Sequence, residues 1–394
     1  MLTLVQRFKW THIDYLAALA KEVDLHVAWS QVGHPGAPEQ AVREGLRAES
    51  VGTIQVEWAP AVSRALADLI SRTQPDLVHV MYYNHEELTL LLRKVIGPQM
   101  PLVWECRDPV TTLRGASPDS PIWRLEADAI NAADAHILAS DALRRYLERS
   151  HGVDLRAALI VPHAFGARFA GPLSEKLSAR DGRTHLALVG TVDEAPGFGR
   201  YYVDIIRRLV SLGFVVHSHF HDDGDSLEPY ARLAEELDDY HHHPTVSFRD
   251  GLRLSEITSS YDLMGVFHEL GAPSHNESAT LAVCIPSKAV SAWLHGAIPI
   301  VTFPHYRGLV ELIGQLGIGL VVDDWAAVGN LAHDRDAIAR ATAACLEHRL
   351  TFSHEHQAQR IRAFYDTLLD RRAPVVAYSR PVPEPQVIRG AEHE

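Results

Sequence analysis

Three residues, Pro286, Ser287 and Lys288, stand immediately before an apolar stretch with helical spacing that runs to Gly296. Proline suits a position at or just before a helix start, because its missing N–H is not needed there. Ser287 can cap the first turn, and Lys288 adds a cation beside free backbone N–H groups and the positive end of the helix dipole. Together they predict an anion site suited to a phosphate. The alternative is an ordinary capped helix that leads into a buried strand.

Acidic residues at the end of one predicted strand offer a second kind of chemistry. The segment PLVWECRDPVTTL (101–113) ends its strand with Glu105, Arg107 and Asp108. Strand ends in open α/β sheets face the ligand crevice, so a carboxylate there could take a proton from a bound hydroxyl. Asp108 is the favoured candidate for this role, with Glu105 beside it. The alternative is an Asp108 that caps a turn or pairs with Arg107.

Histidine clusters suggest a third chemistry, metal binding. HFHDDGD (219–225) and HHH (241–243) are the richest of them, and an HxH pattern followed by carboxylates could ligate zinc. We expect no metal, because the first cluster leads from a strand into a polar turn and the second precedes a proline in a predicted loop. His79, on a predicted strand, is expected to be a core histidine. Glu126, on a predicted helix, is expected to be structural.

Composition limits the classes of partner. The chain has 394 residues, of which 46% are hydrophobic and 22% charged, and this length favours two globular cores. Its net charge of −13 argues against duplex nucleic acid or an anionic membrane as the main partner. We identify neither a secretory signal nor a transmembrane run, which leaves a peripheral membrane contact open. Three well-separated cysteines favour the reducing cytoplasm.

Short apolar runs alternate with amphipathic stretches along most of the chain. LTLVQRF (2–8) and DLHVAWS (24–30) are typical strands, and HIDYLAALAKE (12–22) between them has helical spacing. Further strands are predicted at 75–83, 101–107, 135–140, 157–165, 185–191, 214–220, 245–251, 261–267, 298–303 and 317–324. Strands separated by such helices imply parallel βαβ units. The predicted fold class is therefore α/β, with two Rossmann-like domains.

The domain boundaries follow from a polar, charged stretch in the middle of the chain. We predict an N-terminal domain over 1–168, a linker over 169–183 and a C-terminal domain over 184–352. A long helix is predicted over 353–372, and the Pro-rich tail over 373–394 is expected to be mobile.

Five segments together resemble the nucleotide-sugar glycosyltransferases of the GT-B fold, especially the family 4-like members of bacterial polysaccharide and natural-product biosynthesis. Ser287, Lys288, Gly296 and Pro299 fall on that family's donor-helix segment, where Pro-Asn-Lys opens the helix and Gly-x-Pro ends it. The other segments are DAHILASDALRRYL (134–147), LIVPHAFGARF (159–169), LALVGT (186–191) and VSFRDGLRLSEITSSYDLM (246–264). The resemblance implies two domains that face a cleft, and a C-terminal helix that crosses back to the N-terminal domain.

The same resemblance assigns the donor site. It implies that the diphosphate of a UDP- or GDP-sugar is bound by Gly190, Thr191, Ser287 and Lys288. No metal and no resident cofactor would then be required, because the nucleotide sugar is a co-substrate. Retention of configuration is slightly favoured, by resemblance alone. The acceptor is expected to be a small molecule or a glycan bound by N-terminal loops, and the oligomeric state is left open.

Departures from the family pattern concern the donor ribose and sugar. The family's ribose-binding Glu is replaced by Ser291, whose hydroxyl can still bond a ribose. A second Glu of many retaining members is replaced by Val283, although Glu269 and Glu277 are nearby, and Glu277 is the candidate for contact with the sugar. The usual basic residues after the glycine turn are also absent, with Arg200 as the nearest substitute. These departures support two alternatives: a non-catalytic nucleotide-sugar-binding relative, and a sugar-nucleotide epimerase of the same fold.

Overall fold

The computed structural model describes most of the chain in two compact units. The described residues are 1–8, 10–32, 36–51, 59–81, 86–192, 201–221, 227–244, 251–267, 275–370 and 387–388. Unit 1 holds Met1–Gly166 together with the helix that begins at His354. Unit 2 runs from Ala167 to Ser353 and also holds the short last strand.

Unit 1 is a parallel sheet of seven strands with helices between them. Its strands are β1 (Leu2–Phe8), β2 (His26–Val32), β3 (Arg47–Ser50), β4 (Val78–Met81), β5 (Leu102–Cys106), β6 (Ala135–Leu138) and β7 (Leu159–Ile160). Its helices are α1 (Trp10–Glu22), α2 (Ala37–Arg43), α3 (Ala59–Thr73), α4 (Glu86–Ile96), α5 (Val110–Leu113), α6 (Pro121–Ala132), α7 (Asp141–His151) and α17 (His354–Asp370).

Unit 2 repeats this plan with a second parallel sheet of seven strands. Its strands are β8 (His185–Thr191), β9 (Val215–His221), β10 (Tyr240–His242), β11 (Leu263–Val266), β12 (Ile300–Thr302), β13 (Gly319–Val322) and β14 (Val387–Ile388). Its α-helices are α8 (Ser178–Asp181), α9 (Val203–Ser211), α10 (Glu228–Glu236), α11 (Gly251–Thr258), α12 (His275–Val283), α13 (Ser287–Ser291), α14 (Arg307–Leu316), α15 (Trp325–Leu331) and α16 (Arg335–His348). A π-helical turn over Ala292–Gly296 continues α13, and 3₁₀ turns lie at Ala167–Phe169 and Arg349–Phe352.

The strand order reverses once in each sheet. The order is β3-β2-β1-β4-β5-β6-β7 in unit 1 and β10-β9-β8-β11-β12-β13-β14 in unit 2. The reversal falls between β1 and β4 in the first sheet and between β8 and β11 in the second. In open α/β sheets ligands bind beyond the carboxyl ends of the strands at such switch points. The predicted α/β class with two Rossmann-like domains is confirmed.

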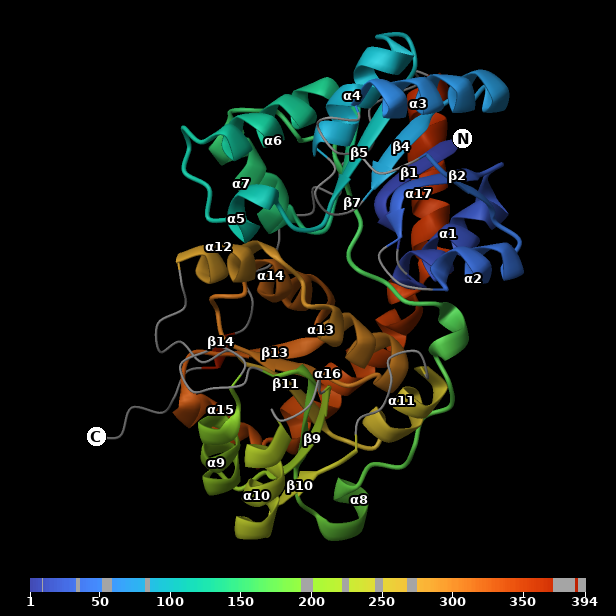
Figure 1. Ribbon diagram of the computed structural model, residues 1–394. Helices are drawn as coiled ribbons and strands as arrows, with labels where there is room; N and C mark the ends of the chain where they lie inside the picture. Colours follow the sequence, from blue (N-terminus) through green and yellow to red (C-terminus); the bar gives the residue numbers. More distant parts are fainter. Residues whose placement is uncertain are drawn as a thin grey trace. The chain divides into compact units, whose positions relative to one another are not determined.

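Alternation along the strands builds a core on each face of the first sheet. Val5 packs in the core that contains residues of α1 and α17, whereas its neighbour Leu4 packs in the core that contains residues of α3 and α4. Successive side chains of a strand point to opposite faces, so a run of apolar residues supplies both cores. Figure 1 shows α17, the red helix, running alongside α1 in unit 1. The C-terminal helix therefore returns to the N-terminal domain, as predicted.

The segment predicted as a linker is part of unit 2. The Ser174 N–H donates to the Ser259 hydroxyl at 2.8 Å, and the Lys176 ammonium contacts the backbone carbonyl of Tyr261. The Ser178 hydroxyl donates to the Asp262 carboxylate at 2.5 Å. Residues 169–183 thus run along the end of α11 and the residues that follow it.

The strand predicted over 245–251 stays a prediction. Residues 245–250 lie outside the described residues, and Gly251 begins α11. The structure shows a strand in the histidine run itself: β10 includes two residues of the HHH run that we predicted in a loop. β10 pairs with β9 with His241 opposite His217, and the centres of these two imidazole rings lie 5.0 Å apart. This tertiary contact outweighs the polar composition of the run.

Among the described residues, no helix is both long enough and apolar enough to cross a bilayer. Cys106, Cys284 and Cys345 are all free thiols.

Candidate functional site

The carboxyl end of β8 and the start of α13 meet in unit 2. Gly190, the penultimate residue of β8, has a φ of +121°, a backbone conformation that favours glycine. A Cβ atom at Gly190 would lie 3.8 Å from Cδ of Lys288. The fold thus brings together two predicted site residues that are far apart in the sequence.

The Lys288 ammonium lies at the switch point of unit 2. Its Nζ donates to the Tyr202 hydroxyl at 2.9 Å and lies 5.4 Å from the centre of the Tyr202 ring. The Tyr202 hydroxyl donates in turn to the carbonyl of Phe267, the residue that follows β11, at 3.3 Å. The group therefore links the ends of β8 and β11, where the strand order reverses. Sequence analysis missed Tyr202, because no local motif marks it.

Ser287 and Thr191, the other two predicted diphosphate-binding residues, are both exposed. Thr191 is the last residue of β8. Pro286 occupies the N-cap position of α13 with an extended backbone, and no side chain caps the helix. Ser287 is therefore the first helical residue rather than the cap that we predicted. Its exposed hydroxyl lies next to the N–H groups of the first helical turn.

The residue predicted to contact the donor ribose is buried in unit 2 and hydrogen-bonded there. Ser291 is 4% exposed, and its hydroxyl lies 2.9 Å from Nδ1 of His295, one turn further along the helix. Val283, which stands where a second family Glu is usual, is also buried. Glu277 belongs to α12, but its side chain lies outside the described residues. Glu269 and Arg200 lie outside them entirely.

In unit 1 the predicted catalytic residue Glu105 is the centre of a closed ionic network. Its side chain is fully buried near the carboxyl end of β5, where Oε1 accepts from Arg107 Nε at 2.7 Å. Oε2 accepts from the Tyr15 hydroxyl at 3.1 Å and lies 3.1 Å from Nε2 of His79. Burial alone would raise the pKa of Glu105, but Arg107 and His79 lower it to about 2. A carboxylate so stabilised is a poor proton acceptor at neutral pH, so its geometry indicates a structural role.

Of the other polar residues that the sequence singled out in unit 1, two are buried and one is partly exposed. His79 is fully buried and its Nδ1 lies 2.7 Å from the hydroxyl of Tyr365 on α17, as expected of a core histidine. Glu126 is fully buried and accepts from the Thr111 hydroxyl at 2.6 Å and from His151 at 2.8 Å. Asp108 is partly exposed and lies two residues beyond the end of β5, so it remains a candidate base.

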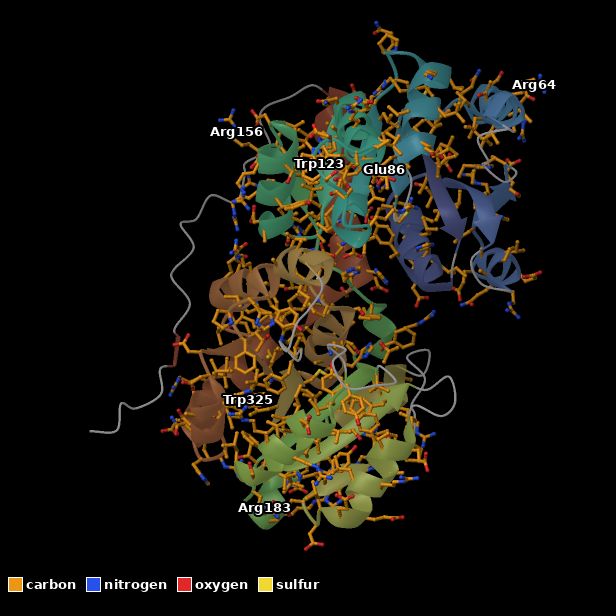
Figure 2. All side chains as sticks on the ribbon, turned by 60° about the vertical axis from the view of Figure 1, so that its left-hand side comes forward. Arg64, Glu86, Trp123, Arg156, Arg183 and Trp325 are labelled. Carbon is orange, nitrogen blue, oxygen red and sulfur yellow. The ribbon has the colours of Figure 1, made fainter. Side chains whose placement is uncertain are left out.

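Sequence analysis missed Glu86, a buried carboxyl at the first position of α4. It is 4% exposed, and Figure 2 shows it inside unit 1, whereas Arg64 and Arg156 project from the surface. Burial, reinforced by the nearby Glu126 carboxylate, raises the pKa of Glu86 to about 7, against the opposing effects of its own backbone amide and Arg114. An acidic residue at a helix start ordinarily faces solvent, so sequence gave no signal of its burial.

Histidines of β8, β9 and the end of β10 form a hydrogen-bonded stack. Nδ1 of His185 lies 2.9 Å from Nε2 of His217, whose Nδ1 lies 3.0 Å from Nε2 of His243. The Asp181 carboxylate lies 3.1 Å from Nε2 of His185 at one end of this chain. Burial, with the neighbouring imidazoles, lowers the pKa of His217 to about 2 and that of His219 to about 4. Within the described ranges, no three His, Cys, Asp or Glu residues are grouped so as to hold a metal ion.

The chain matches the sequence model of one family and resembles many solved structures. Residues 10–164 match the sequence model of Glycosyltransferase Family 4. No curated protein sequence matches the chain.

Three solved structures illustrate the likeness. HepE from Anabaena, solved in complex with UDP, has a TM-score of 0.65 at 15% identity, over 93% of this chain and 99% of that one. Sucrose-phosphate synthase from Thermosynechococcus elongatus has a TM-score of 0.64 at 15% identity, over 94% and 99%. A putative UDP-N-acetylglucosamine 2-epimerase from Listeria monocytogenes has a TM-score of 0.54 at 12% identity, over 95% and 97%.

These structural matches establish the fold of the chain, and the family match over residues 10–164 adds sequence evidence in the N-terminal half. The chain has the GT-B fold, and the resemblance to the nucleotide-sugar glycosyltransferases of that fold is confirmed.

Proposed function

We propose that this protein transfers a sugar from a nucleotide-sugar donor, a UDP- or GDP-sugar, to a small-molecule or glycan acceptor. One observation carries the proposal: the Lys288 side chain lies beside Gly190, near the end of β8 at the switch point of the unit 2 sheet. Open α/β sheets bind nucleotides there, and a phosphate is the anion that a lysine at a glycine turn suits. The UDP bound to HepE, a protein of the same fold, supports a nucleotide as the ligand.

The chemistry of transfer explains why a cation is needed. Breaking the bond between the sugar and the diphosphate places negative charge on the leaving oxygen while the sugar gains oxocarbenium character. Preorganised donors directed at that oxygen stabilise the transition state more than the ground state. Lys288 supplies the charge, and Ser287 with the first amides of α13 supplies further donors. In this proposal neither a metal ion nor a resident cofactor takes part.

On the acceptor side we assign a subsidiary role to Asp108. It follows β5 and is partly exposed, so it could accept the proton of an acceptor hydroxyl in an inverting reaction. We favour retention of configuration, in which the leaving phosphate takes that proton and no protein base is required. Glu105 is left out of the chemical step because both of its oxygens are occupied by buried partners.

A second candidate function is binding of a nucleotide sugar without turnover. The observation that favours it is Ser291, whose hydroxyl bonds His295 within the core at the position where the family carries its ribose-binding Glu. A donor held without that carboxylate would be bound through its diphosphate, and catalysis would depend on orientation supplied elsewhere. The epimerase alternative has weaker support, since the epimerase above has the lower TM-score, 0.54 against 0.65 for HepE.

The test is incubation of the purified chain with a panel of UDP- and GDP-sugars and a mixture of simple sugars, glycans and lipid-linked acceptors. Chromatography with mass spectrometry then follows each donor. We expect at least one donor to release its nucleoside diphosphate, with the sugar moved to an acceptor or to water. Tight binding with no consumption of any donor would favour the binding function. Conversion of a donor to an epimer, without release of diphosphate, would favour the epimerase.

A further inference from the structure

We propose that Tyr202 is the positioning residue for Lys288: its hydroxyl holds the ammonium beside the Gly190 turn and so presents it to the diphosphate of a bound nucleotide. The inference rests on the proposed donor site and adds a residue that acts on the ligand only through the lysine. The Nζ of Lys288 donates to the Tyr202 hydroxyl at 2.9 Å, within the normal range of a charge-assisted hydrogen bond.

Tyr202 is itself held rigidly. Its side chain is 1% exposed, and its ring stacks on Phe220 with centroids 5.4 Å apart and planes 11° apart. Its backbone N–H donates to the Tyr230 hydroxyl at 3.0 Å. A side chain fixed at both its backbone and its ring holds its hydroxyl at one place, which is what a positioning residue requires.

The direction of each hydrogen bond follows from the chemistry of the groups. A backbone carbonyl only accepts and an ammonium only donates. The single phenolic proton of Tyr202 therefore goes to the Phe267 carbonyl at 3.3 Å, and a lone pair of the same oxygen faces Lys288. One N–H of the ammonium is thereby used. The other two donors have no partner among the residues that the structure describes, and we assign them to phosphate oxygens of the ligand.

The consequence is preorganisation. A free lysine side chain samples many rotamers, and ordering it on binding weakens the affinity for the ligand. The Tyr202 hydroxyl orders it in advance, while the face of the ring adds a cation–π contact 5.4 Å from Nζ. Tyr202→Phe removes the hydroxyl and keeps the ring. We therefore expect this variant to bind a nucleoside diphosphate about ten- to a hundred-fold more weakly, the range for one hydrogen bond to a charged group.

The experiment is a double-mutant cycle on the full chain. Calorimetry measures the dissociation constants of UDP, GDP, ADP and dTDP for the wild type, Tyr202→Phe, Lys288→Ala and the double variant. The matched control is Tyr240→Phe, which removes another buried tyrosine hydroxyl of unit 2, one that bonds Ser218 at 2.7 Å. We expect Tyr202→Phe to weaken binding in the wild-type background and to have no further effect once Lys288 is removed. Tyr240→Phe should bind like the wild type.

The outcomes separate this inference from the proposed function. If Tyr202→Phe binds like the wild type, or weakens binding equally with and without Lys288, the positioning role is wrong and the lysine site stands alone. If Lys288→Ala binds as tightly as the wild type, or the wild type binds none of the four nucleotides, the donor site itself fails and this inference fails with it.

A measurement without ligand tests the same contact. Reductive methylation followed by mass spectrometry gives the reaction rate of each lysine. An ammonium held by a buried hydroxyl reacts slowly, so we expect Lys288 to be methylated several-fold faster in Tyr202→Phe than in the wild type or in Tyr240→Phe. Equal rates in all three proteins would show that the hydroxyl does not hold the lysine.

Discussion

The charged residues at the carboxyl ends of β5 in unit 1 and β8 in unit 2 differ in burial and in pairing. Near the end of β5, Glu105 and Arg107 are buried together and both carboxylate oxygens are occupied. Beside the end of β8, Lys288 is partly exposed, and its Nζ has a single partner among the described residues, the neutral Tyr202 hydroxyl.

This difference distinguishes charges that stabilise the fold from a charge that is suited to bind a ligand, on two sheets of similar topology. A buried ion pair whose donors and acceptors are all used stabilises one arrangement of the chain and has nothing left to offer a ligand. The network of Glu105 also includes Tyr15 from α1 and Tyr365 from α17, so it joins two helices to the sheet. A cation with spare donors contributes little to folding and is suited to an anion. We therefore expect the first site to affect stability and the second to affect ligand binding.

The largest expected effect is on the closed network. Glu105→Leu leaves the Arg107 guanidinium buried without its carboxylate, and this should destabilise the protein by about 3–5 kcal/mol. Urea unfolding measures the loss, and hydrogen exchange with mass spectrometry assigns it to unit 1. The double variant Glu105→Leu with Arg107→Met removes both charges, so it should be less destabilised than the sum of the two single variants. Strict additivity would mean that the two residues are not coupled as the structure shows.

Glu86, a buried carboxyl of unit 1 with no salt bridge to any residue that the structure describes, should behave in the opposite way. The folded state raises the pKa of Glu86 to about 7, above its unfolded value of about 4.3, so folding is penalised as pH rises from about 4.3 to 7. Glu86→Gln avoids this penalty. We expect the variant to be about 1–3 kcal/mol more stable than the wild type at pH 8 and close to it at pH 4.5.

The control for this prediction is Glu87→Gln, which removes an exposed carboxyl from the next position of α4. The groups whose charge acts on Glu86 are Glu126, Glu87 and Arg114. A Glu86→Gln variant that is less stable than the wild type at pH 8 would contradict the assigned environment.

The imidazole stack of unit 2 should make stability depend on pH in the reverse direction. Burial keeps His217 neutral in the folded state down to about pH 2, whereas the unfolded chain takes up its proton near pH 6.5. Stability is therefore complete above about pH 6.5 and falls as pH is lowered, by about 1.4 kcal/mol per pH unit for each such imidazole. His217→Gln should flatten the dependence between pH 6 and pH 4 by about one proton.

His333→Gln, a substitution of an exposed histidine in the same unit, is the matched control and should leave that slope unchanged. The groups that face His217 are His185, His219, His241, His243 and Tyr261. An unaltered slope in His217→Gln would show that the ring is charged in the folded protein near pH 5.

The sequence predicted the fold and one half of the site. Alternating apolar runs and helical spacing were sufficient for the α/β class, because those patterns are local. Pro286, Lys288 and Gly190 were also predicted, since residue type alone marks a helix start and a glycine turn. The structure places Gly190 and the Lys288 side chain close together in unit 2, and their role in donor binding stays a prediction.

What the sequence could not show depends on contacts between distant segments. Tyr202 is important because its hydroxyl reaches Lys288 and Phe267, and no pattern around Tyr202 reveals this. Glu105 and Asp108 look equivalent as acidic residues of one segment, and only burial separates them. The direction of the Ser291 hydroxyl, toward His295, likewise depends on packing.

The most direct test of the central claim is the affinity of Lys288→Ala for a nucleoside diphosphate. Calorimetry with UDP and GDP compares it with the wild type and with Lys21→Ala, which removes an exposed lysine of α1 in unit 1. We predict that Lys288→Ala binds about ten- to a thousand-fold more weakly, with an unchanged unfolding midpoint, and that Lys21→Ala binds like the wild type. Equal affinity of Lys288→Ala and the wild type, in a fully folded protein, would contradict the account.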